Sequence, residues 1–145
     1  MIGLIQRVSS ASVDIDGKRV AQIGQGLLAL IGVLPEDDSA SGAKLLQRIL
    51  NYRVFSDEAG KMNLSLSQVK GGLLLVSQFT LAADTAKGLR PGFSTAAPPE
   101  QGLKLFEELI GLARTWHQEV QCGVFGADMQ VSLVNDGPVT IWLES

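Results

Sequence analysis

The sequence predicts a single α/β domain, residues 1–145, in which mixed β-sheet layers carry two main helices packed on one side. Three observations support this fold class. Stretches with strand-like patterns fill the N-terminal third, two longer stretches have helical periodicity, and two further strand patterns close the chain. With 145 residues, the chain is long enough to enclose one substantial core. No linker or internal repeat interrupts it, so we expect strands and helices to share that core.

Four segments of the N-terminal third alternate apolar with polar residues or form short apolar runs, and we expect strands at 1–8, 11–16, 19–23 and 27–34. Asp16 and Gly17 form a dipeptide that favours tight turns, which predicts a hairpin at this point. Farther along, glycines bound the continuous apolar run 71–82, a pattern typical of a strand buried on both faces.

The two helices are predicted within 39–55 and from Pro98 onward. Ser39 or Ser41 can cap the start of the first helix. Its inward face is predicted to consist of Leu45, Leu46, Ile49 and Leu50. Pro98 and Pro99 open the second helix, because the missing N–H of proline costs least in the first turn. The inward stripe of this helix is predicted to consist of Leu103, Phe106, Ile110, Ala113 and Trp116.

The chain ends in two predicted strands, 128–135 and 139–144, which Asp136, Gly137 and Pro138 separate. Two interpretations of this separation are open. Asp-Gly between strands is typical of a hairpin turn, with Pro138 stiffening its exit. Alternatively, the Gly137–Pro138 peptide bond is cis, which would set two carbonyl groups side by side in a rigid device made of main chain alone.

Composition excludes several classes of protein. Hydrophobic residues make up 46% and charged residues 19%, and no apolar run approaches the ~18 residues of a membrane-spanning helix. The start does not resemble a secretory signal, and Cys122 is the only cysteine, so we expect a cytoplasmic protein without disulfides. A net charge of −3 argues against broad binding along nucleic-acid backbones, and we expect no DNA partner. A small contact with a nucleic-acid end stays compatible with this charge.

Conventional catalytic groups are nearly absent. His117 is the only histidine, and its place near the end of the second helix indicates a structural or solvent-facing role. No nucleophile is positioned beside it for a catalytic triad, and no cluster of His, Cys, Asp or Glu has the spacing of metal ligands. We therefore expect neither a metal nor a cofactor.

Polar residues instead interrupt the apolar run 71–82, where Ser77, Gln78 and Thr80 stand at positions that a buried strand would fill with Val or Ile. Neighbouring main chain can satisfy such groups in a purely structural role. The functional interpretation is a pocket rim at a strand end, with Phe79 as an apolar wall. The sequence shows no base that would activate a hydroxyl as nucleophile. The long loop that follows, 82–99, is either a surface excursion or part of a binding site.

Two motifs considered together resemble the signatures of the D-aminoacyl-tRNA deacylases: SQFTL at 77–81 and NDGPVT at 135–140. Four further stretches resemble this family in the same order along the chain. They are MIGLIQRVSSASV at the start, YRVFSDEAGKMNLS at 52–65, KGLRPGF at 87–93 and FGADMQVSLVNDGPVT at 125–140. The resemblance covers essentially the whole chain, and two separated motifs are far more specific than either one.

The resemblance implies a homodimeric hydrolase with active sites at the subunit interface. Its substrate would be the 3′ end of aminoacylated tRNA, from which it removes a D-amino acid or glycine as a proofreading step of translation. Gly137 and Pro138 would form a cis-peptide gate that enters the partner's site and rejects L-amino acids. The pocket would be lined by Ser77, Gln78, Phe79 and Thr80 and bordered by Phe125 and Met129. Arg7 would orient the gate.

Such an enzyme needs few catalytic side chains, because an aminoacyl ester is already activated and the neighbouring ribose 2′-hydroxyl can assist attack. Lys87 and Arg90 in the long loop are candidates for phosphate contacts, with ordinary solvated loop charges as the alternative. Two other functions stay open. One is an esterase in which Thr80, or Ser77, acts as nucleophile, and the other is a module that binds aminoacyl-tRNA ends without catalysis.

Overall fold

The computed structural model describes all residues, 1–145. One six-stranded mixed sheet has the order β2-β1-β3-β6-β7. β3 and β2 pair with successive stretches of one edge of β1, and β8 pairs with its other edge. A separate two-stranded sheet pairs β4 with β5. The strands are β1 (Ile2–Ile15), β2 (Lys18–Ile23), β3 (Gly26–Gly32), β4 (Arg53–Ser56), β5 (Met62–Ser65), β6 (Gly72–Ser77), β7 (Val120–Cys122) and β8 (Gln130–Glu144). The helices are α1 (Ser39–Asn51), the short α2 (Leu66–Val69), a 3-10 helix (Phe79–Ala82) and α3 (Pro99–Trp116).

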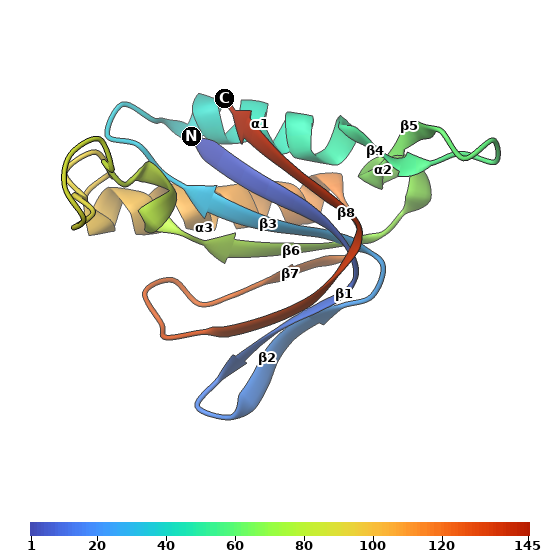
Figure 1. Ribbon diagram of the computed structural model, residues 1–145, viewed down its shortest axis with the longest axis horizontal. Coiled ribbons are helices and arrows are strands. Elements are labelled where there is room, and N and C mark those ends of the chain that lie inside the picture. Colours follow the sequence, from blue (N-terminus) through green and yellow to red (C-terminus); the bar gives the residue numbers. More distant parts are fainter.

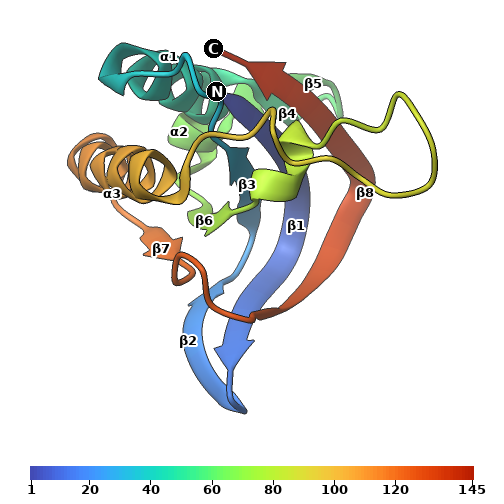
Figure 2. The same ribbon diagram turned by 90° about the vertical axis from the view of Figure 1, so that its left-hand side faces the viewer.

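The two main helices, α1 and α3, lie on the same side of the large sheet, as predicted (Figure 1). Seen from the side, the sheet curls strongly, with β1 and β8 arching together from the helical layer to the β1–β2 hairpin (Figure 2). Both chain ends lie close together at one end of these two strands. The α/β class with a mixed sheet is therefore confirmed.

β1 is the strand to which most of the sheet is attached. The two predicted segments 1–8 and 11–16 form one continuous strand of 14 residues. Its first half pairs with β3, its second half with β2, and nearly its whole length with β8. The hairpin to β2 turns at Asp16 and Gly17, both with positive φ (49° and 75°), as a tight two-residue turn requires. The hairpin predicted at these residues is confirmed.

α1 buries the predicted face, since Leu45, Leu46, Ile49 and Leu50 are all among its buried residues. The cap differs from the prediction. Asp38 accepts a hydrogen bond from the Ser41 N–H, and the Ser41 hydroxyl accepts one from the Asp38 N–H, so the two residues cap the helix reciprocally. Hydrogen bonding from Ser41 to the ionised carboxylate lowers the pKa of Asp38.

α3 begins beside the predicted prolines, but its buried stripe was predicted only in part. Phe106 and Ala113 are buried, whereas Leu103 and Trp116 are 39% and 48% exposed. The buried face is turned by about one residue from the prediction and consists of Gly102, Leu105, Phe106, Leu109 and Ala113. The core lies against Leu105 and Leu109, which the predicted stripe did not include, although both are spaced from Phe106 and Ala113 as residues of one helical face.

The hairpin interpretation of the C-terminal segment is wrong. β8 runs as one strand from Gln130 to Glu144 and pairs antiparallel with β1 on both sides of Asp136, Gly137 and Pro138. Thr140 pairs with Gln6 and Asn135 pairs with Val8, so residues 136–139 stand opposite the single residue Arg7. We call this segment the β8 bulge (136–139).

The apolar run 71–82 forms a strand only as far as Ser77 and then turns into the 3-10 helix. Leu73 and Leu75 of β6 belong to the core cluster under the helices, and Leu74 and Val76 belong to a second cluster on the other face of the sheet. Burial of β6 on both faces is thus confirmed. No helix of the structure combines the length and apolar character needed to cross a membrane.

Close contact between β3 and β6 supplies a stability test. A Cβ atom added at Gly26 would lie 1.9 Å from the carbonyl oxygen of Gly72, which belongs to rigid main chain. We expect Gly26→Ala to lower the free energy of unfolding by about 3 kcal/mol in urea denaturation, because the two strands must separate to admit the methyl group. Gly24→Ala is the matched control, since a Cβ atom there meets nothing within 4 Å. Equal stability of both variants would contradict the close strand contact.

Candidate functional site

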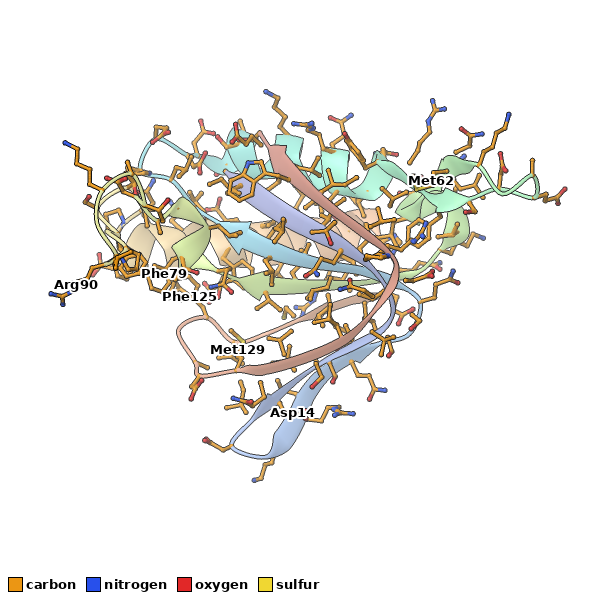
Figure 3. The ribbon with its side chains drawn as sticks, in the orientation of Figure 1. Asp14, Met62, Phe79, Arg90, Phe125 and Met129 are labelled. Carbon is orange, nitrogen blue, oxygen red and sulfur yellow. The ribbon has the colours of Figure 1, made fainter.

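A pocket of about 610 Å³ opens at the end of the large sheet where β6 stops. Its floor is formed by the ends of β3 and β6, one wall by the first turns of α3, and the other wall by the connection from β7 to β8. In Figure 3, the labelled side chains of Phe79, Phe125 and Met129 lie toward this same end of the molecule. Twelve of the 17 lining residues are hydrophobic, so the few polar groups at its rim stand out.

The polar rim comes from the segment that the sequence singled out. The Gln78 N–H donates to the Ile31 carbonyl oxygen at 2.7 Å, which completes the β6 pairing, and the chain then enters the 3-10 helix. Ser77, Gln78 and Phe79 line the pocket. Thr80 does not: its side chain is exposed, and its hydroxyl oxygen accepts a hydrogen bond from the Gln78 amide. Three of the four residues predicted from this motif therefore lie at the pocket, and Thr80 lies outside it.

Phe125 and Met129 border the pocket from the β7–β8 connection, as the resemblance implied. Phe125 packs against the first turns of α3, where a Cβ atom at Gly102 would come within 3.3 Å of its ring. The rings of Phe125 and Phe106 lie 6.2 Å apart between centroids. Met129 covers Gly123, at which an added Cβ atom would lie 2.6 Å from the methionine sulfur. Two glycines thus allow this wall to close against the helix and the sheet.

Sequence reasoning missed several contributors to the pocket, among them Gly102 and Phe93. Gly102 was not considered, although a glycine inside an otherwise regular helix is a signal of close packing. Phe93 also lines the pocket and packs edge-on against Phe79, with ring centroids 5.0 Å apart. Phe93 is the last residue of the KGLRPGF stretch, but nothing local to the sequence indicated that the long loop folds back to this strand end.

Lys87 and Arg90 lie in the loop between the 3-10 helix and α3, and both are exposed. Neither lines the pocket, but the loop leaves from the pocket rim at the 3-10 helix and returns to it at Phe93. Figure 3 shows Arg90 at the outer edge of the same end of the molecule as Phe79. No group of three or more His, Cys, Asp or Glu side chains with the geometry of a metal site occurs in the chain.

The β8 bulge (136–139) is built around Arg7. The Gly137–Pro138 peptide bond is cis, which is the second of the two interpretations that the sequence left open. The Arg7 side chain is only 12% exposed and donates from Nε to the Asp136 carbonyl oxygen at 2.8 Å and from Nη1 to the Val54 carbonyl oxygen. Gly137 has a φ of +131°, and a Cβ atom there would lie 2.9 Å from Arg7 Nη2. Glycine is thus required both by backbone conformation and by the guanidinium beneath it.

The β8 bulge and the pocket of the same chain are far apart. Arg7 faces Leu27 on β3, and Leu27 faces Leu73 on β6, whereas the pocket rim begins four residues farther along β6 at Ser77. On β8 itself, Val131 lines the pocket five residues before Asp136, which corresponds to roughly 17 Å of strand. None of the residues 136–139 lines the pocket. One chain therefore does not bring residues 136–139 to its own pocket.

Removal of the Arg7 contacts should weaken the fold measurably. We expect Arg7→Met, which keeps much of the side-chain volume, to lower the free energy of unfolding by about 2 kcal/mol, because two carbonyl oxygens lose a charged donor. Arg19→Met is the control, because its guanidinium pairs with Asp14 on the exposed β1–β2 hairpin. The control should leave the urea midpoint unchanged. An Arg7 variant as stable as this control would show that the side chain does not hold the bulge.

Comparison with known proteins connects this geometry to a family. A family model described as D-Tyr-tRNA(Tyr) deacylase matches residues 4–144. A D-aminoacyl-tRNA deacylase of Ectopseudomonas mendocina (strain ymp) is 64% identical over 141 residues, covering 97% of each chain. A protein of the same name from Stutzerimonas stutzeri (strain A1501) is 63% identical over 145 residues, covering 100% of each chain.

Two solved structures resemble the chain over nearly its full length. The c-Myc DNA Unwinding Element Binding Protein has a TM-score of 0.96 at 40% identity and covers 100% of this chain and 99% of its own. A structure described as a probable eukaryotic D-amino acid tRNA deacylase has a TM-score of 0.88 at 14% identity, covering 99% and 98%. At so low an identity, the second likeness supports the fold alone.

Proposed function

This chain belongs to the D-Tyr-tRNA(Tyr) deacylase family, and on that premise we propose that it hydrolyses the ester bond between a D-amino acid, or glycine, and the 3′-terminal adenosine of tRNA. The observation that carries the proposal is the pocket at the end of β6, whose lining contains no histidine, cysteine or charged side chain. Such a pocket suits a substrate that brings its own reactivity. In this proposal the enzyme acts in the cytoplasm, without metal or cofactor, as a proofreading step of translation.

Main-chain groups at the strand end are proposed to stabilise the transition state. When water attacks the ester carbonyl, negative charge develops on its oxygen, and N–H donors aimed at that oxygen lower the barrier. The Gln78 N–H is already engaged by the Ile31 carbonyl. The donors that the proposal assigns are therefore the N–H groups of Phe79 and Thr80, which begin the 3-10 helix and have no partner within it. The ribose 2′-hydroxyl of the substrate assists attack, in place of a protein base.

Exclusion of L-amino acids is assigned to a main-chain gate from a second copy of the chain. Gly137 and Pro138 are exposed, and Arg7 binds the carbonyl oxygen of the neighbouring Asp136, yet neither residue lines the pocket of its own chain. In a homodimer with active sites at the subunit interface, this segment would meet the pocket of the partner. A clamp close to the α-carbon admits a hydrogen atom or a D side chain and collides with an L side chain.

The remaining site residues have supporting roles in this proposal. Ser77, Gln78 and Phe79 line the amino-acid and adenosine pocket, and Phe125 and Met129 close its far wall. Lys87 and Arg90 contact phosphates of the tRNA end. The esterase alternative is weaker, because the Thr80 hydroxyl is exposed and lies outside the pocket. Its hydrogen-bond partner is the Gln78 side-chain amide, which is not a base.

Paired hydrolysis assays test the reaction. With D-tyrosyl-, glycyl- and L-tyrosyl-tRNA as substrates, we expect release of D-tyrosine and glycine at rates at least about 100-fold above that of L-tyrosine, which corresponds to a steric penalty of about 3 kcal/mol. Similar rates for both tyrosine enantiomers would rule out the chiral gate. Binding of the charged tRNA ends without any release of amino acid would identify a binding module instead.

The same assay separates the nucleophile mechanisms. Thr80→Ala should reduce kcat for D-tyrosyl-tRNA by less than about tenfold, since it removes only a hydrogen bond to Gln78. Loss of a covalent nucleophile would instead reduce kcat by several orders of magnitude. Detection of an acyl-enzyme on Thr80 or Ser77 by mass spectrometry after rapid quenching would contradict the proposed mechanism.

Mixed dimers test the cross-subunit arrangement. Gly137→Val adds a side chain to the segment that would enter the partner's pocket and obstructs the substrate there, and Ala127→Trp fills the pocket with a bulky ring, so each variant alone should be inactive. After the two variants are unfolded and refolded together, mixed dimers contain one site with both parts intact, and about one quarter of wild-type activity should return. Each variant refolded by itself is the control. Failure to regain activity, with mixed dimers shown to form, would place gate and pocket in one chain.

A further inference from the structure

The proposed function uses the interior of the pocket but leaves an exposed pair of aromatic rings at its mouth. Phe79 and Phe93 are 54% and 42% exposed, although both also line the pocket. Their rings meet edge to face, at an interplanar angle of 63°, so part of each ring face stays open to solvent. Unpaired bases can stack on aromatic faces of this kind with little dependence on sequence.

Hydrogen bonds fix the main chain on both sides of Phe93. Asp84 and Gly92 exchange two hydrogen bonds, at 2.8 and 2.9 Å, which close the loop immediately before Phe93. Just after it, the Ala96 N–H donates to the Phe93 carbonyl, and the Ala97 N–H donates to the Val33 carbonyl at 2.9 Å. The ring therefore stands on a fixed base between two turns, and little conformational entropy is lost when a ligand stacks on it.

The loop 84–92 extends from this pair and carries charge suited to a nucleic-acid backbone. Lys87 and Arg90 are exposed near its tip, and the Asp84 carboxylate at its base accepts a hydrogen bond from the Ala86 N–H. The loop also encloses a shallow hollow of about 320 Å³, lined by Thr85, Gly88, Leu89, Arg90 and Pro91. The Leu89 side chain at the tip is fully exposed. In a chain of net charge −3, this is a local cationic and apolar surface beside the pocket.

From the pocket outward, the Phe79–Phe93 pair comes first and the loop 84–92 follows. In Figure 2, the walls of the pocket, α3 and the β7–β8 connection, lie to the left of the 3-10 helix, and the loop 84–92 lies to its right. We propose that the Phe79–Phe93 pair and the loop 84–92 form a track for the unpaired nucleotides that precede the terminal adenosine. One base stacks on Phe93, and Lys87 and Arg90 contact the adjoining phosphates. This inference rests on the proposed function, which places the terminal adenosine in the pocket.

Fluorescence of a modified RNA tests the stacking directly. The probe is a short single-stranded RNA ending in CCA, with 2-aminopurine in place of the last cytosine, because stacking quenches the emission of this base. Wild-type protein should quench the probe. Phe93→Leu keeps an apolar side chain but cannot stack, and it should bind the probe about tenfold more weakly. Phe93→Trp should restore binding. Trp116→Leu removes another exposed aromatic residue, at the far end of α3, and should bind as wild type does.

Kinetics distinguish the track from the pocket. Phe93→Leu should raise KM for D-tyrosyl-tRNA by about tenfold, and should raise KM for D-tyrosyl-adenosine, which lacks the preceding nucleotides, by markedly less. Equal losses on both substrates would show that Phe93 only shapes the pocket and would overturn the track. Unchanged quenching by Phe93→Leu would overturn the track too. A loss of self-association of this variant in sedimentation would also overturn it, because it would assign the Phe79–Phe93 pair to an interface between copies of the chain.

Failure of the proposed function has a different signature. Wild-type protein would then release no amino acid from any charged tRNA or from D-tyrosyl-adenosine. Phe93-dependent quenching of the RNA probe would still support the track in that case, and its absence would count against both. Hydrolysis of D-tyrosyl-tRNA that is insensitive to Phe93, with no quenching, would retain the proposed function and reject the track.

Discussion

The structure depends on the pairing of β1 with three other strands. Its N-terminal half is hydrogen-bonded to β3, its C-terminal half to β2, and its other edge to β8 over nearly the full length. A strand of 14 residues with both edges paired imposes its own twist on its neighbours, and the curl of the sheet follows from it. This curl places β6 and β7 under α3 and leaves the end of β6 as the floor of the pocket.

Main chain, rather than ionisable side chains, supplies the distinctive parts of the candidate site. The rim is a strand end that turns into a 3-10 helix, and the proposed gate is a bulge braced by one arginine. Both depend on the register of the sheet, because each begins where a ladder of hydrogen bonds stops. Precise placement of main-chain groups requires few side chains but demands a rigid scaffold, which the two core clusters on opposite faces of the sheet provide.

Local pattern predicted the elements whose determinants are local. The Asp16-Gly17 turn, the apolar face of α1 and the two-sided burial of β6 were all indicated by spacing and residue type. Long-range pairing decided the rest. Asp-Gly at 136–137 has the composition of a hairpin, yet β1 pairs with the chain on both sides of it, so that no reversal occurs. The buried stripe of α3 and the return of Phe93 to the pocket rim likewise depend on tertiary packing that periodicity does not contain.

The β8 bulge also separates the two halves of its strand. Thr140 pairs with Gln6 on one side of the bulge, and Asn135 pairs with Val8 on the other. Each pairing is fixed independently and does not depend on the number of residues between them. The sheet would accept a shorter or longer insertion opposite Arg7 without moving any side chain from one face to the other. The pairing of the sheet therefore does not fix the length of this segment, although its present conformation depends on the hydrogen bond from Arg7 to the Asp136 carbonyl oxygen. Contacts beyond its own sheet then determine how far the segment projects, so the sheet and the reach of the proposed gate can change separately.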